Sequence, residues 1–332
     1  MSEATIKQIA EELKIHPSTV SRALSGHPQI SDETRKKVLQ VAKKLNYTPN
    51  FWAQNLVGSK TNLIGCMVLE LTNPFYIPMV RAIEDRLVNH PYLLFIGESR
   101  RKLEIEKQVI KKFRYIRASG LIITPVLSNL DHLKELEADG VPVIVTGRTV
   151  DEFDSVNVDN RKSGVIAGQH LIDRGYIKIG YVQSGDPFNF PEKDRFMGLK
   201  SVLKKHNQEL QTIFTVGNNT INGGEKAGKM WLSGKNRPKA VFCSNDMLAM
   251  GFIQYLIRSG VRIPHDVSVI GHDDVSSADR FIIPLTTVVF PKYKMGQIAM
   301  KELLHRISYP KYPHVPKKID LEPKLIFRES CL

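Results

Sequence analysis

The sequence predicts an all-α head that contains a helix-turn-helix, followed by a much larger α/β body of two subdomains. Two short helical patterns joined by a turn open the chain, and a third follows them. From Asn62 onward, apolar strand patterns alternate with amphipathic helical patterns, which is typical of a parallel, doubly wound sheet. Eight or more strands in about 270 residues exceed one comfortable sheet, so we expect two subdomains.

The first two helices of the head are separated by a break at Lys14-Ile15-His16. The second begins at Pro17, where a missing N–H costs nothing in the first helical turn, and ends at Gly26, which suits a left-handed cap. Two short helices joined in this way form a helix-turn-helix, whose second helix lies in the DNA major groove. The first helix carries its apolar residues at helical spacing: Ile6, Ile9, Ala10 and Leu13.

A third helix runs from an N-cap at Ser31 to about Leu45. Thr34 stands three residues after the cap, where a full capping box would have Glu. Its apolar positions can close a three-helix core: Val38, Val41, Ala42 and Leu45.

The body alternates strands and helices. The expected strands are Leu63–Leu69, Tyr92–Ile96, Gly120–Thr124, Val141–Val145, Ile179–Gln183, Ala240–Cys243, Val267–Ile270 and Leu285–Val289. The expected helices are Phe75–Asn89, Leu103–Ile116, Leu130–Ala138, Arg161–Arg174, Arg195–His206, Gly223–Leu232, Met247–Ser259 and Tyr293–Arg306.

Composition indicates a cytoplasmic globular protein. The chain has 332 residues, of which 42% are hydrophobic and 24% charged, values typical of soluble domains. It contains no apolar stretch long enough for a spanning helix, and its beginning does not resemble a signal peptide. Three cysteines without paired spacing are typical of reduced thiols.

The net charge of +13 favours a polyanionic partner. The first 60 residues hold seven Lys and two Arg against five acidic residues, a net of +4. A second basic stretch extends from Arg100 to Arg117. We expect that stretch to be a solvated helix face; the alternative is a second nucleic-acid site.

Polar residues cluster where the expected strands end. In open α/β sheets, ligands bind beyond the carboxyl ends of the strands. Two facing subdomains with polar loops at these ends would enclose a small hydrophilic ligand. The clusters are 72–76, 147–148, 185–195, 244–246 and 271–274.

An ordered set of motifs resembles the LacI/GalR family of bacterial transcription regulators over nearly the whole chain. In the head these are Thr5-Ile6-(x)3-Ala10, Ser18-Thr19-Val20-Ser21-Arg22, Ser31-(x)2-Thr34-Arg35-(x)2-Val38 and Leu45-Asn46-Tyr47-Thr48-Pro49-Asn50. In the body they are Leu63-Ile64-Gly65, Asn73-Pro74-Phe75-Tyr76, Asp159-Asn160, Arg195-Phe196-(x)-Gly198, Ser244-Asn245-Asp246, Gly271-His272-Asp273 and Leu285-Thr286-Thr287.

The resemblance implies a domain layout. A helix-turn-helix head (1–49) is followed by a hinge helix and linker (50–60) and by a periplasmic-binding-protein-like body (61–332). The body would consist of two Rossmann-like subdomains, between which the chain crosses three times. The first would combine about 62–160 with 291–318, and the second 161–290 with 319–332.

The resemblance also assigns roles on DNA. Arg22 would read a guanine, with Ser18 as a less discriminating reader and Pro17 contributing shape or a thymine-methyl contact. Thr5, Thr19 and Ser21 would contact phosphates. Alternatively, Arg22 would bind a phosphate, and Thr19 and Ser21 would cap a helix or hydrogen-bond the backbone of the turn.

The segment from Asn50 to Leu56 resembles the hinge helix of the family. Two such helices would pair in the minor groove, with Leu56 as a wedge and Ala53 small enough for close approach. The alternative is that Leu56 packs under the body. A palindromic operator implies a homodimer, for which the helix at 75–89 and the segment at 275–285 are the expected interface.

Effector contacts carry over only where this chain matches the family. The implied set is Phe75, Tyr76, Arg148, Arg195, Asn219, Asn245 and Asp273. Gly147 stands where members often have an acid before the arginine, and Asn219 falls near a position where an aromatic often stacks on the ligand. Arg195 and Asp273 could instead be scaffold residues, and Asn245 and Asp246 could cap the next helix.

The sequence therefore predicts a DNA-binding transcription regulator, most simply a repressor, and not an enzyme. Catalytic, dinucleotide and metal motifs are missing, and His16 and His272 are isolated, so we expect no cofactor and no metal site. The expected partners are double-stranded operator DNA, a sugar, sugar acid or sugar phosphate, and a second copy of the chain, with no membrane. An enzyme and a periplasmic-type binding protein are the alternatives. The effector's identity, and whether it induces or corepresses, stay open.

Overall fold

A computed structural model describes residues 4–24, 27–47, 61–127, 129–187, 189–310 and 314–331. Contacts divide the chain into two units, Met1–Asn62 and Leu63–Leu332, and each is described by itself. The expected cap at Gly26 and the hinge positions Asn50, Ala53 and Leu56 lie outside the described residues.

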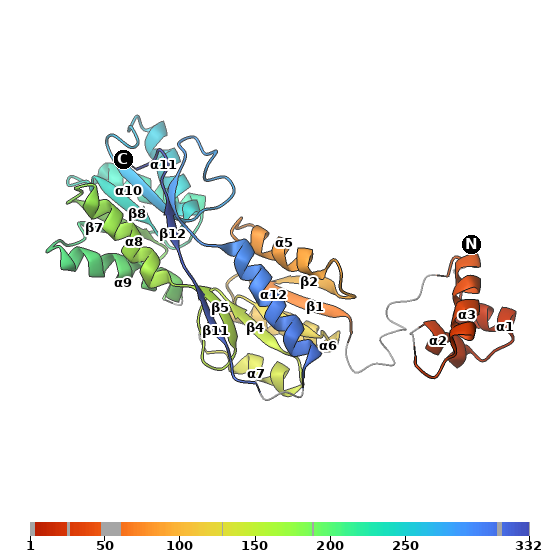
Figure 1. Cartoon of the computed structure of the whole chain (residues 1–332). Coiled ribbons are helices and arrows are strands. Elements are labelled where there is room, and N and C mark those ends of the chain that lie inside the picture. Colours follow the sequence, from red (N-terminus) through yellow and green to blue (C-terminus); the bar gives the residue numbers. More distant parts are fainter. Residues whose placement is uncertain are drawn as a thin grey trace. The chain divides into compact units, whose positions relative to one another are not determined.

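The head is a three-helix unit (Figure 1). Its helices are α1 (Ile6–Leu13), α2 (Pro17–Leu24) and α3 (Asp32–Lys44), which confirms the three expected helices and the first-turn position of Pro17. The core consists of small and branched apolar side chains from all three helices: Ile9, Ala10, Val20, Ala23, Val38 and Ala42.

Side-chain caps fix where two head helices begin. The Ser31 hydroxyl accepts the N–H of Thr34 at 3.2 Å, so the predicted N-cap of α3 is confirmed. Thr5 caps α1 in a full capping box, in which the Thr5 N–H donates to Gln8 Oε1 at 2.8 Å. Such caps satisfy backbone donors that a helix of only two turns cannot satisfy internally.

The body contains two six-stranded sheets (Figure 1). The first has the order β11-β5-β4-β3-β1-β2 and the second β12-β10-β9-β8-β6-β7. The strands of the first are β1 (Leu63–Val68), β2 (Leu93–Glu98), β3 (Gly120–Ile123), β4 (Val143–Thr146), β5 (Asp154–Val158) and β11 (Lys318–Leu321). Those of the second are β6 (Ile179–Gln183), β7 (Thr212–Thr215), β8 (Ala240–Cys243), β9 (Ser268–Asp273), β10 (Thr286–Val289) and β12 (Lys324–Ile326).

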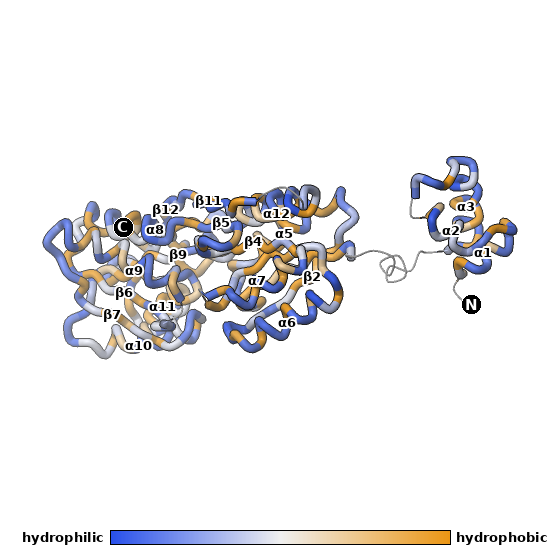
Figure 2. The backbone as a smooth tube through the Cα atoms, turned by 90° about the horizontal axis from the view of Figure 1, so that it is seen from below, coloured by the Kyte–Doolittle hydropathy of each residue, from blue (hydrophilic) through white to orange (hydrophobic). Residues whose placement is uncertain are grey.

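Each sheet is covered on both faces by helices. In the first subdomain, α5 (Tyr76–Leu87) and α12 (Lys292–Ser308) pack on one face, and α6 (Leu103–Tyr115) and α7 (Asp131–Ala138) on the other. In the second, α8 (Asn160–Asp173) and α9 (Phe190–Lys205) oppose α10 (Ile221–Ser233) and α11 (Asp246–Arg258). Figure 2 shows hydrophobic stretches along inner strands such as β4, and hydrophobic and hydrophilic residues alternating along outer helices such as α6. The predicted doubly wound α/β class is confirmed.

Four strands, β5, β7, β11 and β12, were not among the eight expected, and the first two show why. β5 reads Asp-Ser-Val-Asn-Val, yet all five residues are buried between the two helix layers. β7 lies at the edge of its sheet and is largely exposed. Burial here depends on neighbours that are remote in sequence, which a local pattern does not show.

The chain crosses between the subdomains three times, after β5, after β10 and after β11. β11 runs parallel to β5 in the first sheet, whereas β12 runs antiparallel to β10 in the second, with only Glu322 and Pro323 between them. The strand ends of the two sheets face each other, so a chain that leaves one sheet there must enter the other in the opposite direction. The first subdomain therefore extends to Leu321, a few residues beyond the expected boundary at 318.

In the part of the chain that the structure describes, no helix combines the length and the apolar character needed to cross a bilayer.

Candidate functional site

α2 turns its polar side chains away from the core of the head. Val20 and Ala23 are buried, whereas Ser18 and Arg22 are exposed and Ser21 is half-buried. Residues four apart lie on one helix face, so Ser18 and Arg22 form an outward-facing row. That is the geometry that major-groove readout requires of a recognition helix.

The other three head residues expected at DNA lie at or near helix starts. The Thr5 hydroxyl accepts the Gln8 N–H at 3.4 Å, so Thr5 has a capping role besides the expected phosphate contact. Pro17 opens α2, and Thr19 is half-buried with its N–H donating to the His16 carbonyl at 2.9 Å. All three lie within the first turn of a helix or at its cap, where backbone N–H groups also point outward.

His16 has a role that its isolated position in the sequence did not indicate. Its Nδ1 accepts the backbone N–H of Ser18 at 3.3 Å and lies 2.8 Å from the Ser18 hydroxyl. The imidazole thus supplies an acceptor at the start of α2, where the first helical N–H groups lack partners in the helix.

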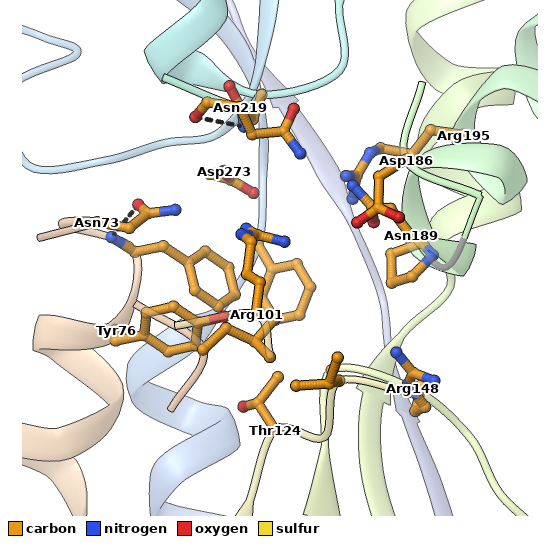
Figure 3. Close-up of a pocket in the computed structure, with 17 residues that line it drawn as sticks. Asn73, Tyr76, Arg101, Thr124, Arg148, Asp186, Asn189, Arg195, Asn219 and Asp273 are labelled. Atoms are coloured by element: carbon orange, nitrogen blue, oxygen red, sulfur yellow. Dashed lines mark hydrogen bonds between the residues drawn. The ribbon is translucent and has the colours of Figure 1, made fainter. Parts of the chain in front are cut away.

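A cavity lies between the two subdomains, at the carboxyl ends of their strands (Figure 3). Its volume is about 770 Å³, including its open mouth. We call it the inter-subdomain cavity. The structure brings all seven expected effector residues to its wall: Phe75, Tyr76, Arg148, Arg195, Asn219, Asn245 and Asp273.

Three aromatic rings form an apolar side of the cavity. Phe75 packs edge-on against Tyr76 at 5.0 Å and against Phe290 at 4.8 Å between ring centroids. Burial raises the pKa of Tyr76 to about 12, so its hydroxyl stays protonated. Such a wall suits the apolar face of a ring-shaped ligand.

Arg148 follows β4 and reaches toward the opposite subdomain. Its Nη2 donates to the Pro125 carbonyl at 3.2 Å, and its guanidinium lies 5.6 Å from the ring centroid of Phe190, at the start of α9. Among the described residues, Nη1 is buried without an acceptor. Burial lowers the pKa of Arg148, because it disfavours the charged form.

Arg195 is held by a polar chain that begins at the first crossing. Its Nη1 donates to Asn160 Oδ1 at 2.6 Å, and Asn160 donates to the Val158 carbonyl at 2.9 Å. Only 7% of Arg195 is exposed, and its Nε is buried with no acceptor among the described residues. The side chain is therefore fixed in place at the wall of the cavity.

Asn245 and Asn219 lie together at the second-subdomain side of the cavity. Asn245 Oδ1 accepts the Leu248 N–H at 2.8 Å, so the capping alternative for Asn245 is realised. Its Nδ2 donates to the Asn219 carbonyl at 3.4 Å, and both residues line the cavity. Asn219 Oδ1 is buried without a donor in the described part of the chain.

Asp273 stands at the end of β9 with a left-handed backbone, φ +115°. His272 Nδ1 lies 2.9 Å from its carboxylate, and burial lowers the pKa of His272 to about 4. The neutral imidazole therefore donates to Asp273 at pH 7. The buried Lys292, at the start of α12, donates to the backbone carbonyls of Asp273 and Asp274, the latter at 2.9 Å.

The expectation that Asp246 caps α11 is wrong. Asp246 is the first helical residue, and its carboxyl accepts from Thr287 Oγ1 at 2.6 Å and from the Val275 N–H at 2.9 Å. It therefore ties α11 to β10 and to the loop after β9, below the cavity floor. Burial, assisted by the nearby Asp273, raises the pKa of Asp246 to about 8.

Several lining residues were not predicted, although each follows a strand end. Arg101 belongs to the basic stretch after β2, yet it lines the cavity and pairs with Glu70 at 3.5 Å. Elsewhere in that stretch Arg114 pairs with acids of α7, as a solvated helix face would. Asn73, Asp186 and Asn189 also line the cavity; they belong to the expected clusters 72–76 and 185–195 but were not named as effector contacts. Thr124 lines it from outside those clusters.

Metal chemistry finds no support in the described residues, in which no group of three or more His, Cys, Asp or Glu side chains could hold an ion.

Comparison with known proteins fixes the family. Residues 5–50 match the model of bacterial regulatory proteins of the lacI family, and residues 169–331 match a periplasmic binding protein-like domain. The chain is 31% identical to the ribose operon repressor of Haemophilus influenzae, across 98% of each protein. The chain belongs to the LacI family. It is also 30% identical to the transcriptional repressor PurR of Photobacterium profundum, again across 98% of each.

Comparison with solved structures supports the same family. The Lac repressor dimer bound to operator and an anti-inducer superposes with a TM-score of 0.85 at 25% identity, over the full length of both chains. A LacI-family regulator from Enterococcus faecium with bound ribose has a TM-score of 0.73 at 27% identity, covering 81% of this chain and 98% of that one. The protein is thus a LacI-family transcriptional repressor, not an enzyme, with structural neighbours that bind sugars.

Proposed function

We propose that this repressor binds a palindromic operator as a homodimer and responds to a small polar effector, a sugar or sugar derivative, in the inter-subdomain cavity. The observation that carries the proposal is the convergence of seven family-matched residues on one cavity, in a chain whose head presents an exposed recognition helix. The proposed layout is a DNA-binding head (1–49), a hinge and linker (50–60) and a body (61–332), working in the cytoplasm.

On DNA, Arg22 donates to a guanine edge and Ser18 adds a weaker contact from the same helix face. Pro17 shapes the approach of α2 to the groove. Thr5, Thr19 and Ser21 bind phosphates and set the register. Outside the described residues, Leu56 acts as the minor-groove wedge, with Asn50 and Ala53 on the same hinge helix.

Exposed apolar side chains on α5, β2 and the loop before α5 support a dimer. Leu71, Ile77, Val80 and Ile96 border one surface hollow, and Phe95 is 45% exposed on the same edge strand. Monomeric proteins rarely leave such a contiguous patch in water. The segment at 275–285 extends the interface through Ile282, which is 66% exposed.

An effector alters DNA binding by changing the relative pose of the subdomains. Arg148 contacts Phe190 across the cleft, and Lys292 ties α12 of the first subdomain to the strand that carries Asp273. A ligand that prefers one closure state shifts the population toward it, by no more than its difference in affinity. That shift orders or melts the hinge segment and so sets operator affinity.

Selection of genomic binding sites with the purified protein, at fixed salt and with a panel of sugars and derivatives, tests the proposal. We expect a palindrome whose occupancy changes with one compound. Arg22→Ala should relax preference at one base position in each half-site, whereas Thr19→Ala should weaken all sites alike. No enriched palindrome, with or without the panel, would contradict the proposed operator binding.

Leu56→Ala tests the wedge separately. The substitution should weaken specific operator binding and leave effector binding intact. Unchanged operator affinity would exclude the wedge role.

A further inference from the structure

Lys292 places a buried ammonium group at the junction between the two subdomains. It is the first residue of α12 and is only 6% exposed. Its Nζ donates to three backbone carbonyls: that of Asp273, that of Asp274 at 2.9 Å and that of Phe290 at 3.2 Å. An ammonium group has three N–H donors, so these bonds use all of them. The group therefore ties the end of β9 to the start of α12 with its full set of donors.

The position is unfavourable for a cation. Lys292 lies in the first turn of a helix, where the helix dipole repels positive charge. Burial also lowers the pKa of Lys292, because it disfavours the charged form, and the nearby carboxylates of Asp273 and Asp246 oppose that effect. The cation is thus poorly placed for the stability of α12 alone, and its hydrogen bonds across the junction offset that cost.

The turn that accepts these hydrogen bonds has a strained backbone. Asp273 and Asp274 have φ angles of +115° and +54°, in the left-handed region that residues other than glycine rarely adopt. Such conformations persist where the surrounding contacts hold them. Because both carbonyls accept from Lys292, its ammonium group helps to hold the turn in this form.

The side chains of the same turn are held from within the second subdomain. Asp274 Oδ1 accepts from Nη2 of Arg328, two residues after β12, at 2.7 Å. Asp273 accepts from His272, the preceding residue of β9. The turn is therefore anchored to the second subdomain through its side chains and to the first subdomain through the ammonium group of Lys292.

On the first-subdomain side, Lys292 belongs to a closely packed pair of helices. A Cβ at Gly296 of α12 would lie 2.4 Å from the Met79 carbonyl of α5, so the two helices are in backbone contact, side by side in Figure 1. The Lys292 ammonium also lies 6.0 Å from the ring centroid of Phe75, the residue before α5. Phe75 and Asp273 both line the inter-subdomain cavity (Figure 3). A ligand bound to Asp273 is thus linked through Lys292 to α12 and α5, and α5 carries part of the proposed dimer surface.

We propose that Lys292 is a positioning residue that sets the relative pose of the two subdomains and transmits the effector's contact with Asp273 to α12 and α5. It acts on the ligand through Asp273. Without its ammonium group, three carbonyls would lose a donor and the turn would lose this tie to the first subdomain. The transmission rests on the proposed function, since it requires an effector at Asp273, whereas the pose can be measured without any ligand.

Two matched variants test the pose. Lys292→Met removes the tie from the first subdomain, and Arg328→Met removes a tie from the second subdomain to the same turn; each replaces a cation by an uncharged, flexible side chain. Spin labels at Lys112→Cys on α6 and Lys229→Cys on α10, both exposed positions, report the distance between the subdomains by double electron–electron resonance. The three native cysteines are buried, and an excess of unlabelled protein keeps labels to one protomer of a dimer.

We expect Lys292→Met to double the width of the distance distribution, or to shift its mean by more than that width, and Arg328→Met to leave it unchanged. Thermal unfolding reports whether the variants are folded. Lys292→Gln keeps two N–H donors without the charge, so it is the milder variant and should give the same change to a smaller degree. A distribution that is unchanged in both Lys292 variants, or that changes equally in Arg328→Met, would overturn the proposal.

Operator affinity of the unlabelled full chain, measured without and with saturating D-ribose, D-glucose, D-galactose or cellobiose, tests the transmission. Saturation removes the influence of any loss in sugar affinity. The effect of an active sugar on operator affinity should fall to within about twofold of no effect in Lys292→Met and should be retained in Arg328→Met.

The same measurements distinguish failure of the inference from failure of the proposed function. A sugar that acts on Lys292→Met as strongly as on the unsubstituted chain overturns the transmission and supports effector control. If none of the four sugars changes operator affinity of the unsubstituted chain while the distances change as expected, the result supports the pose assignment and contradicts control by these sugars.

Discussion

The two subdomains of the body repeat one strand order but complete their outer surfaces in different ways. Each sheet ends in an edge strand at the equivalent place, β2 in the first and β7 in the second. β2 exposes Leu93, Phe95 and Ile96, whereas β7 exposes a single large apolar residue, Ile213. An apolar edge beside an apolar helix face is typical of an interface, which is consistent with the dimer proposed above.

Both helix pairs of the second subdomain pack through glycines, whereas the first subdomain has one such contact among its described residues, where a Cβ at Gly296 of α12 would lie 2.4 Å from the Met79 carbonyl of α5. A Cβ at Gly198 of α9 would lie 2.0 Å from the Arg161 carbonyl of α8, and one at Gly251 of α11 would lie 2.0 Å from the Ile221 carbonyl of α10. Backbones this close leave little freedom for either helix pair. From these contacts we expect the second subdomain to act as a rigid clamp.

A buried glutamate holds the strand-end loops in each subdomain, with different numbers of contacts. Glu106 accepts from Val126 and His132. Glu192 accepts four bonds, from the N–H and hydroxyl of Ser184, the N–H of Gly185 and the hydroxyl of Ser244. The cavity wall is therefore more tightly fixed on the second-subdomain side.

The largest expected effect tests the glycine contacts. Gly198→Val should lower the free energy of unfolding by about 4 kcal/mol or prevent folding, because the side chain meets backbone that cannot move aside. Denaturant unfolding followed by circular dichroism measures it. Gly234→Ala is the control: its Cβ would meet nothing closer than 3.4 Å, and we expect a change within about 0.5 kcal/mol. Equal losses would refute the rigid-clamp interpretation.

The next largest effect is expected at the edge strands. Phe95→Asp on β2 should raise the dimer dissociation constant at least about 100-fold, or about 2.7 kcal/mol, because it places a charge in the proposed apolar interface. Ile213→Asp on β7, with a similar exposed fraction of 44%, should leave it unchanged. Sedimentation equilibrium distinguishes the two. A dimer weakened only by the β7 variant would reverse the comparison.

The loss of stability on replacing each buried glutamate should follow the number of hydrogen bonds that it accepts. Glu192→Gln should cost about 2–3 kcal/mol of unfolding free energy, since its amide group would face donors, and Glu106→Gln about 1–2 kcal/mol. Thermal and denaturant unfolding of the two variants side by side gives the order. A larger loss for Glu106→Gln would show that the first-subdomain wall is the tighter one.

The smallest effect is a pH dependence below the cavity floor. Asp246 has a folded pKa of about 8, above its value of 3.8 in the unfolded chain, so the folded state binds more protons between these values and stability falls as pH rises. His272 has its pKa lowered to about 4, so its contribution is lost as pH falls below 6.5. The two offset each other between pH 4 and 6.5, and above that only Asp246 of these two contributes a slope.

From pH 6.5 to 8 the unfolding free energy should therefore fall by about 1.5 kcal/mol, at roughly 1.4 kcal/mol per pH unit for one proton. Asp246→Asn should abolish that slope, although Asp273 and Lys292 still face the position. His272→Gln should keep it and should uncover the opposing Asp246 slope below pH 6.5. A wild-type slope that survives in Asp246→Asn would assign the proton elsewhere.

Local patterns were sufficient for most of the fold. The head helices, the caps at Pro17 and Ser31 and the apolar strands follow from periodicity and capping chemistry, which depend on near neighbours. The same patterns missed β5, whose polar residues are buried only because helices cover both faces of its sheet. The last crossing, which the family resemblance placed at about 318, follows Leu321, because β11 pairs with the distant β5.

For the cavity, too, some features follow from the sequence and others only from the tertiary structure. By itself the sequence determined which polar residues follow strand ends, and its motifs named seven that line one cavity. Only the tertiary structure decided that Arg101 joins them, that Asp246 braces the floor, and that Arg148 and Arg195 line the cavity from opposite subdomains. Burial is a property of the assembled sheets, since these side chains have their neighbours on other elements, such as Asn160 for Arg195 and Thr287 for Asp246.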